Sequence, residues 1–316
     1  MRLNRERFFL VLLFLSLAYS LFAGEIITHD YAALGEGITV FALPDGAGEE
    51  AYLGGEITLT RGGSPVYSRS QFFLYPGDDK SWCALMGIPS DLEKGTYVLT
   101  CRMETEGGTE VLQKRIALTE REFPSEVLVL NGSLTDIRVK EDPEKTSQAQ
   151  RLWSLLASFD DEERYTSGVL VPPMDEYRVT TDYGCRRVYE YADGSEAGTI
   201  HNGWDWAAPT GTPLKAVGKG RIVMAEDRIV TGKSVMLELL PGVFVLYYHL
   251  DELNCEVGDL VEAGDIVGTV GMTGLATGPH LHWEMRISRV AVDPLPFLEG
   301  NLIDKSLYMD KIVDTL

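Results

Sequence analysis

Basic residues are scarce in this sequence, and their scarcity excludes one class of partner. Its 316 residues include 28 Lys and Arg against 48 Asp and Glu, so the formal net charge is −20. Binding a phosphate backbone requires a basic surface. We therefore expect no nucleic-acid partner. The hydrophobic share of 45% is nevertheless enough for buried cores, and the length has room for two domains.

Cysteine is also rare, with four in the whole chain: Cys83, Cys101, Cys185 and Cys255. They form no C-x-x-C pair, which argues against a cysteine-ligated zinc site. The first two fall in one predicted domain and the last two in the other. Two intradomain disulfides are therefore one interpretation for an exported chain, and four reduced, buried thiols are the other.

Long apolar runs are missing except at the N-terminus. Three arginines within the first seven residues precede residues 8–17, which are nearly all apolar, and small residues follow at Ser20 and Ala23. This order is typical of a secretory signal, so we assign residues 1–23 to a signal peptide. The protein is then expected to be exported to the periplasm or cell envelope. An uncleaved membrane anchor is the alternative, although the run is short for a hydrocarbon core of ~30 Å.

Residues 24–128 have the pattern of antiparallel β structure. Strand-like runs at 56–69 and 95–118 each surround a Gly-Gly pair, as in hairpins. In the second run, Tyr97, Leu99, Cys101 and Met103 should share one face, with Thr100 and Arg102 on the other. Several such strands within about 100 residues predict a β-sandwich of the immunoglobulin-like kind.

Residues 129–169 are predicted to be a helical linker. Asp142 can act as an N-cap, with Pro143 at the first helical position. An apolar stripe follows at helical spacing: Ala149, Leu152, Trp153, Leu156 and Phe159. This stripe predicts a helix that packs on one of the two domains.

From residue 170 to residue 300, short β-branched runs alternate with glycines. This texture predicts closely spaced strands joined by tight turns. The glycines lack the Lys-Ser/Thr ending and the following helix of a phosphate-binding loop, so they are turn residues. Residues 301–316 are expected to form a short surface helix or tail.

Four of the five histidines lie in this second domain, and the fifth, His29, is expected to be a solvated surface residue. The four occur in three motifs, with an aspartate four residues after the first: His201, Asp205, His249, His280 and His282. A strand turns residues two apart to the same face, so the last two histidines can reach one point. Imidazole nitrogen and carboxylate oxygen both ligate zinc, and a catalytic zinc keeps three protein ligands and one open position. The set predicts a metal site.

Together these motifs resemble the lysostaphin/LytM family of zinc metalloendopeptidases, which cut peptidoglycan peptides. The resemblance covers about 180–297. The motifs that carry it are "HNGWDWAAP" from residue 201, "YYHL" from 247, the glycine-rich run "CEVGDLVEAGDIVGTVGMTG" from 255, and "TGPHLHWE" from 277. It implies a mainly β protein whose C-terminal antiparallel sheet forms a LytM-type peptidase domain holding Zn²⁺.

The resemblance also implies roles for five residues. His201, Asp205 and His282 would be the zinc ligands. His249 and His280 would be the catalytic pair, sharing acid–base work and stabilisation of the oxyanion.

Three further residues are candidates for the rim of the site. The family's F-G-x-R motif reads "YGCRR" here, so Arg186 or Arg187 would line the approach. Tyr247 lies two residues before His249 and is expected on the same face, where it either orients substrate or packs. The glycine-rich turn found in many members before Y-x-H-L reads "LELLPGVFVLYYHL", so the rim of the cleft is expected to differ.

Two hypotheses of function follow. The first is an active endopeptidase that hydrolyses peptide bonds in the stem or cross-link peptides of peptidoglycan. The second is a catalytically silent member that binds or activates another cell-wall hydrolase; such members usually lose one or more of the five residues, and all five are present. The N-terminal β domain would position the enzyme or shield its cleft, or else bind wall polymer, cell-wall proteins or divisome proteins.

Overall fold

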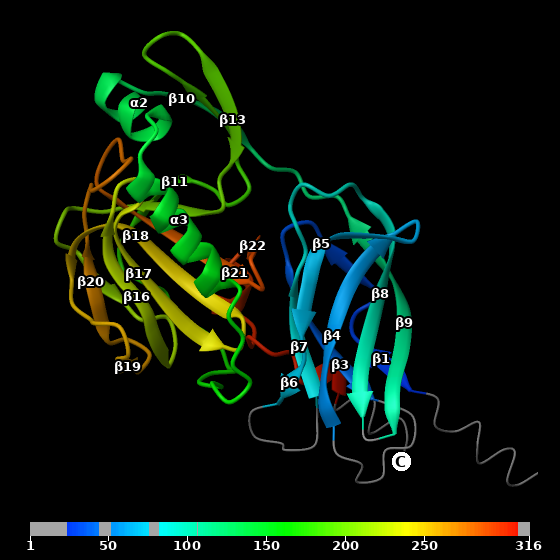
Figure 1. Ribbon diagram of the computed structural model, residues 1–316. Coiled ribbons are helices and arrows are strands. Elements are labelled where there is room, and N and C mark those ends of the chain that lie inside the picture. Colours follow the sequence, from blue (N-terminus) through cyan, green and yellow to red (C-terminus); the bar gives the residue numbers. More distant parts are fainter. Residues whose placement is uncertain (1–23, 44–51, 76–81, 106, 309–316) are drawn as a thin grey trace, which may run out of the picture.

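The structure is a computed structural model that describes residues 24–43, 52–75, 82–105 and 107–308. The predicted signal peptide, residues 1–23, lies outside this part of the chain. Among the described residues, no helix is both long and apolar enough to cross a membrane. The described chain is mostly β and divides into two halves that lie side by side (Figure 1).

Two sheets form the N-terminal half. The first has the order β1 (Glu25–Ile27), β3 (Gly37–Leu43), β7 (Trp82–Gly87) and β6 (Phe73–Leu74). The second has the order β2 (Tyr31–Ala33), β9 (Gly108–Thr119), β8 (Gly95–Thr105), β4 (Tyr52–Arg61) and β5 (Ser64–Gln71). Both predicted hairpins are confirmed, since β4 pairs with β5 and β8 with β9 in antiparallel register. Gly62 and Gly63 form the first turn with φ of 59° and 83°, values that favour glycine.

The predicted alternation along β8 is also confirmed. On its inner face, Tyr97, Leu99, Cys101 and Met103 are at most 1% exposed and belong to a core that includes Val40 and Met86 of the first sheet. The two sheets therefore pack against each other through this shared core. Whether their connectivity makes the domain immunoglobulin-like stays a prediction.

A large sheet dominates the C-terminal half. Its main path runs β11 (Arg178–Thr181), β14 (Gly203–Ala207), β21 (His280–Ile287), β18 (Val243–Leu253), β17 (Gly232–Leu240), β16 (Gly220–Arg228) and β19 (Leu260–Val261). Off this path lie β15 (Pro213–Lys215), β20 (Ile266–Val270) and β22 (Val290–Val292), and a short 3-10 helix, η1, covers Leu295–Leu298. Every pairing given for this sheet is antiparallel, as predicted.

Two helices and a small sheet connect the halves. Helix α2 spans Gly132–Val139, and α3 spans Pro143–Leu156. Asp142 caps α3 by accepting a hydrogen bond from the Glu144 N–H at 2.8 Å, so the predicted helix start is confirmed. Leu156 is buried against Phe244 and Leu246 of the large sheet, but Ala149 and Trp153 are exposed, so the predicted packed stripe is wrong for these two residues.

The small sheet joins three strands from different parts of the sequence. Its order is β10 (Ser125–Val129), β12 (Arg186–Glu190) and β13 (Glu196–Ile200), with β10 parallel to β12. Strand β10 follows the N-terminal half directly in sequence and lies on the predicted boundary at residue 128. Although it follows the N-terminal half, β10 pairs with a strand of the C-terminal half in this sheet.

The outer face of β7 belongs to a second core that reaches into the C-terminal half. Cys83 and Leu85 share this core with Ile287 and Val290. Leu302 and Ile303, at the start of the segment expected at the surface, are each 1% exposed and belong to it as well. The halves are thus joined by continuous apolar packing.

All four cysteines are described, and all four are free thiols. Cys83 faces the core between the halves, whereas Cys101 faces the core between the two N-terminal sheets. The two thiols belong to different sheets, and the first sheet separates them because Cys83 points away from the second sheet, so they cannot be bridged without moving the backbone. Burial also raises the pKa of the Cys101 thiol to about 12.

Candidate metal centre

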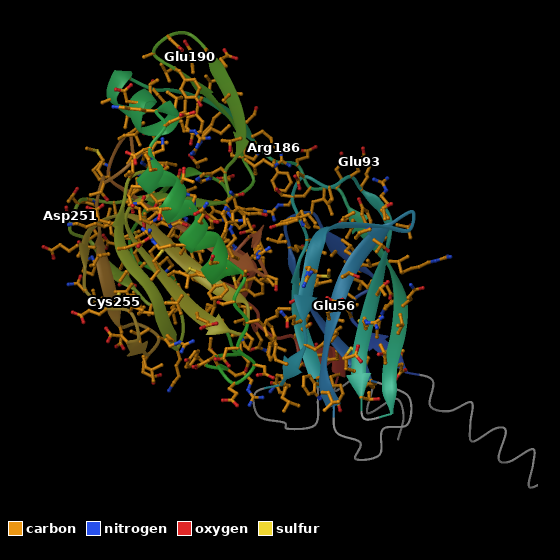
Figure 2. The ribbon with its side chains drawn as sticks, in the orientation of Figure 1. Glu56, Glu93, Arg186, Glu190, Asp251 and Cys255 are labelled. Atoms are coloured by element: carbon orange, nitrogen blue, oxygen red, sulfur yellow. The ribbon has the colours of Figure 1, made fainter. Side chains whose placement is uncertain are left out.

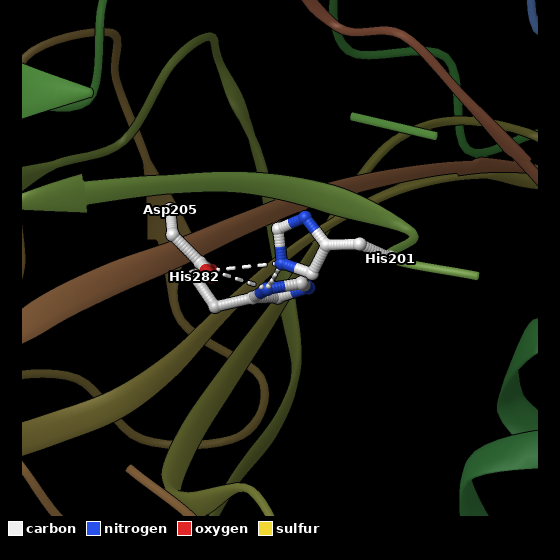
Figure 3. Close-up of side chains that lie close together, drawn as sticks. All are labelled: His201, Asp205 and His282. Atoms are coloured by element: carbon white, nitrogen blue, oxygen red, sulfur yellow. Dashed lines mark hydrogen bonds and ion pairs between the residues drawn. The ribbon is translucent and has the colours of Figure 1, made fainter. Parts of the chain in front are cut away.

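Three side chains converge at the centre of the large sheet. Asp205 of β14 lies opposite His282 of β21 in the strand register, and His201 lies two residues before the first residue of β14. The His201 Nε2 atom lies 2.9 Å from Asp205 Oδ1 and 2.9 Å from His282 Nδ1, and the last two atoms are 2.8 Å apart (Figure 3). All three residues are less than 10% exposed. The predicted ligand set is thus brought together in space.

Hydrogen bonds on the outer side of each imidazole set its orientation. His201 Nδ1 lies 3.0 Å from the Asp182 carbonyl oxygen, so this nitrogen donates. His282 Nε2 lies 3.2 Å from Glu284 Oε2 and donates there. The two inward nitrogens then carry lone pairs, and the Asp205 oxygen between them is also an acceptor. Three acceptors this close repel one another unless a cation or a proton lies among them.

The chemistry of this set fits zinc. Two imidazole nitrogens and one carboxylate oxygen are the ligand types of catalytic zinc sites, and outer N–H groups bonded to a carbonyl or carboxylate are their usual support. Ligands ~2.0–2.2 Å from a tetrahedral zinc lie about 3.3–3.6 Å apart. The present separations of 2.8–2.9 Å therefore need to open by roughly half an ångström.

The pKa shifts of the three side chains also favour a bound cation. Burial would raise the pKa of Asp205, but His201 and His282 outweigh it and hold that pKa well below its usual value. Burial lowers the pKa of His201. It would also lower that of His282, yet hydrogen bonds to Asp205 and Glu284 raise it to about 9. The cluster therefore favours one positive charge at its centre, which a divalent ion would supply on displacing the proton.

His249 and His280 lie beside this cluster, with ring centroids 4.8 Å apart. Each donates from Nδ1 to a backbone carbonyl at 2.8 Å, His249 to Thr273 and His280 to Gly278. Their Nε2 atoms are thus left for the cleft, and that of His280 is 3.7 Å from Asp205 Oδ1. The alternation predicted for the last motif is confirmed, because Leu281 points the other way and is fully buried.

The prediction that Tyr247 shares a face with His249 is wrong, and of its two predicted roles the structure confirms packing. Its hydroxyl accepts the Val217 N–H at 3.0 Å, and the side chain is fully buried on the core side. The reason is the backbone of His249, whose φ of 65° is left-handed and breaks the strand alternation. Tyr248 and His249 therefore both border the cleft, and the Tyr248 ring stacks on His282 with centroids 5.5 Å apart. A left-handed histidine gives no signal in the sequence.

A cleft of about 460 Å³ opens over these residues. One wall is the small sheet, which contributes Glu126, Arg187 and Tyr189. The facing wall consists of the turn at 230–231 and the loop at 275–280. The small sheet thus covers one side of the candidate centre.

The two candidate arginines have different positions. Arg187 bonds Glu126 Oε1 from Nε at 2.5 Å and Asp205 Oδ2 from a terminal nitrogen at 3.1 Å. Arg186 points toward the N-terminal half, where it donates to the Ser90 carbonyl at 2.6 Å (Figure 2). Arg187 therefore lies at the site and Arg186 at the junction of the halves. Glu126 was not predicted, because it is distant in sequence from every motif.

His29 lies away from the cleft. Its side chain is 54% exposed, as expected, and Nε2 is 3.4 Å from Asp304 Oδ2.

Comparison with known families identifies the family of a domain in the C-terminal half. Residues 199–294 match the sequence model of Peptidase family M23, so the chain carries a domain of this family. The match contains the three candidate ligands and both further histidines. It leaves out the small sheet's β10 and β12, and with them Glu126 and Arg187.

Curated relatives resemble the same half. The DD-carboxypeptidase/endopeptidase Mpg of Neisseria meningitidis is 34% identical over 145 residues, which are 45% of this chain and 33% of that protein. Lysostaphin of Staphylococcus staphylolyticus is 41% identical over 109 residues, which are 33% of this chain and 23% of that protein. The chain therefore spans about a third or less of the length of these relatives.

A solved structure resembles more of the molecule. A Pseudomonas aeruginosa protein described as peptidase M23 aligns with a TM-score of 0.54 at 22% identity, over 77% of this chain and 87% of that one. At this identity the likeness shows the fold alone. The arrangement of a β domain beside a peptidase domain therefore has a counterpart among solved structures.

Proposed function

Since the chain carries a domain of peptidase family M23, we propose that it is a zinc-dependent endopeptidase that hydrolyses stem or cross-link peptides of peptidoglycan. The names of the relatives, lysostaphin and peptidoglycan DD-endopeptidase, support this substrate. The observation that carries the proposal is the convergence of three buried acceptor atoms within 2.9 Å of one another, beside two further histidines.

The proposed ligands are His201, Asp205 and His282. Zinc bound there would polarise the scissile carbonyl and lower the pKa of water to ~7. The chain's own contribution begins with orientation. The Asp182 carbonyl and the Glu284 carboxylate hold the two imidazole rings with their lone pairs inward.

His249 and His280 would carry out proton transfer and stabilise the oxyanion. Donation from His249 Nδ1 to the Thr273 carbonyl leaves its Nε2 unprotonated, so this atom can accept a proton from the attacking water. His280 Nε2 lies on the same side of the centre, 3.7 Å from Asp205, where it can serve the oxyanion or the leaving amine. We assign the two steps to the pair jointly. The silent alternative is not favoured, because all five side chains are present.

The proposed substrate places the protein in the periplasm or cell envelope. The N-terminal half would then position the peptidase on the wall or bind cell-wall or divisome proteins. Both statements depend on the substrate assignment.

The direct test is zinc-dependent release of soluble fragments from purified peptidoglycan. We expect the wild-type protein to hold one zinc per chain and to release fragments, and a chelator to stop this release until zinc is restored. His282→Ala should bind no zinc and release nothing. The proposal is contradicted if activity survives complete metal removal, or if the zinc-loaded wild-type protein releases no fragments.

A further inference from the structure

The walls of the cleft carry positive charge that the protein does not neutralise. Arg138, Arg178 and Arg187 all border it. Arg187 is neutralised by Glu126 and Asp205. Within the described ranges, neither of the other two arginines has a carboxylate partner. In a chain of net charge −20, two unpaired guanidinium groups at the cleft are unexpected.

The acidic residues of the cleft are already engaged. Glu126 pairs with Arg187, Asp205 belongs to the candidate metal centre, and Glu284 bonds both His282 and Arg286. None of them faces Arg138 or Arg178 as an ion-pair partner in the described chain. The free charge of the cleft is therefore positive, and it can attract an anionic group of a ligand.

The strand register places Arg178 at a definite distance from the reacting centre. It lies opposite Ala207 of β14, and Ala207 lies opposite His280 of β21. Adjacent strands are ~4.8 Å apart, so the backbones of Arg178 and His280 are about 10 Å apart. All three residues border the cleft, and Ala207 adds only a methyl group between the other two. An extended peptide covers this distance with about three residues at ~3.3 Å each.

We propose that Arg178 anchors a subsite for a free carboxylate of the substrate, about three residues or fewer from the scissile bond. Arg138 of α2 adds a second positive charge, and its guanidinium lies 4.6 Å from the centroid of the Tyr189 ring of β12. Arginine forms paired hydrogen bonds to a carboxylate, which an amide cannot match in charge or geometry. The inference rests on the proposed function and narrows its substrate class to acidic peptides.

The test uses one zinc-loaded protein and two synthetic substrates. One is a cross-linked stem-peptide dimer whose diamino-acid carboxylates are free, and the other is the same dimer with these carboxylates amidated. We expect the wild-type kcat/KM to be roughly ten- to hundredfold higher for the free acid, the range for hydrogen bonds to a charged group. Arg178→Met should remove most of this preference, by lowering kcat/KM on the free acid much more than on the amide, and Arg138 should account for what is left.

Two control variants make the result specific. Arg178→Lys keeps the charge without the paired hydrogen bonds and should retain part of the preference. Arg115→Met removes an exposed arginine from β9 in the other half and should match the wild type on both substrates. The inference is overturned if the wild-type protein cleaves both dimers equally, or if Arg178→Met slows both by the same factor.

Failure of the proposed function gives a different result. In that case zinc-loaded wild-type protein cleaves neither dimer. Isothermal titration calorimetry of the two dimers into the wild-type protein and Arg178→Met then measures their dissociation constants, which test the subsite without turnover. Tighter binding of the free acid, lost in the variant, supports the subsite, and equal binding of both dimers rejects it.

Discussion

His249 combines a strained backbone with a position beside the candidate metal centre. Its φ of 65° is unfavourable for a side chain of this size, a strain of about 1–3 kcal/mol. Two hydrogen bonds hold it: its N–H donates to Thr231 at 2.9 Å and its Nδ1 to Thr273 at 2.8 Å. These bonds fix the ring against the candidate metal centre. Strain of this kind concentrates at functional sites.

His249→Ala tests the proton-transfer role apart from metal binding. We expect the variant to keep one zinc per chain, because His249 is not a proposed ligand. Its kcat should fall roughly 10²- to 10⁴-fold, the usual contribution of general acid–base catalysis. Zinc content by atomic absorption and kcat on a stem-peptide dimer measure the two effects. His29→Ala, which removes an exposed histidine, is the matched control, and wild-type turnover in His249→Ala would refute the role.

Strand β10 contributes a side chain to the candidate site although it lies outside the residues that match the M23 family. It lies outside the M23 match but pairs in parallel with β12, opposite Arg187. Glu126 of β10 thereby binds Arg187, and Arg187 binds the outer oxygen of Asp205. The chain of contacts holds the carboxylate of a proposed ligand from a segment that follows the N-terminal half.

Glu126→Gln is expected to weaken metal binding. The substitution removes the charge that holds Arg187, so Asp205 loses part of its support. Outer partners of metal ligands contribute roughly 10- to 100-fold in metal affinity, and we expect the Kd for zinc to rise by a factor in this range. Competition with a chromogenic chelator measures it without an activity assay. Glu190→Gln on β12, which does not border the cleft, should leave the Kd unchanged, and equal affinities in all three proteins would contradict the role.

At the scale of the whole molecule, the N-terminal half packs closely against the C-terminal half. Its first sheet shares a core with the large sheet, and Arg121 forms an ion pair with the 5%-exposed side chain of Asp293 at 2.5 Å. Close approach is also needed at Gly87, where a Cβ atom would lie 2.7 Å from Val290 Cβ. Packing of this extent predicts that the two halves unfold together.

Leu85→Ala tests this coupling. The side chain is 1% exposed in the core shared by the two halves, and its truncation should lower the free energy of unfolding by about 2–5 kcal/mol. Urea unfolding followed by circular dichroism and by zinc release should show one coincident transition, shifted in the variant. Leu53→Ala, at a 67%-exposed position, should change stability by less than about 0.5 kcal/mol. Two separate transitions in the wild-type protein would refute the coupling.

The sequence by itself determined the features that depend on local periodicity. The hairpin at Gly62-Gly63, the capped start of α3 and the shared face of His280 and His282 all follow from residues close together in the chain. The motif spacing also selected the residues of the proposed metal centre, and the structure brings these side chains together. Their roles stay predictions.

Only the tertiary structure decided which distant segments meet. The strand register places Arg178 in line with His280 and brings Glu126 to Arg187. The left-handed backbone of His249 turns this histidine toward the cleft beside Tyr248, instead of to the core side with Tyr247. The cysteines face different cores, and the two halves share one of these cores. These relations arise from pairing between strands far apart in sequence, and the period of a single strand does not specify its neighbours.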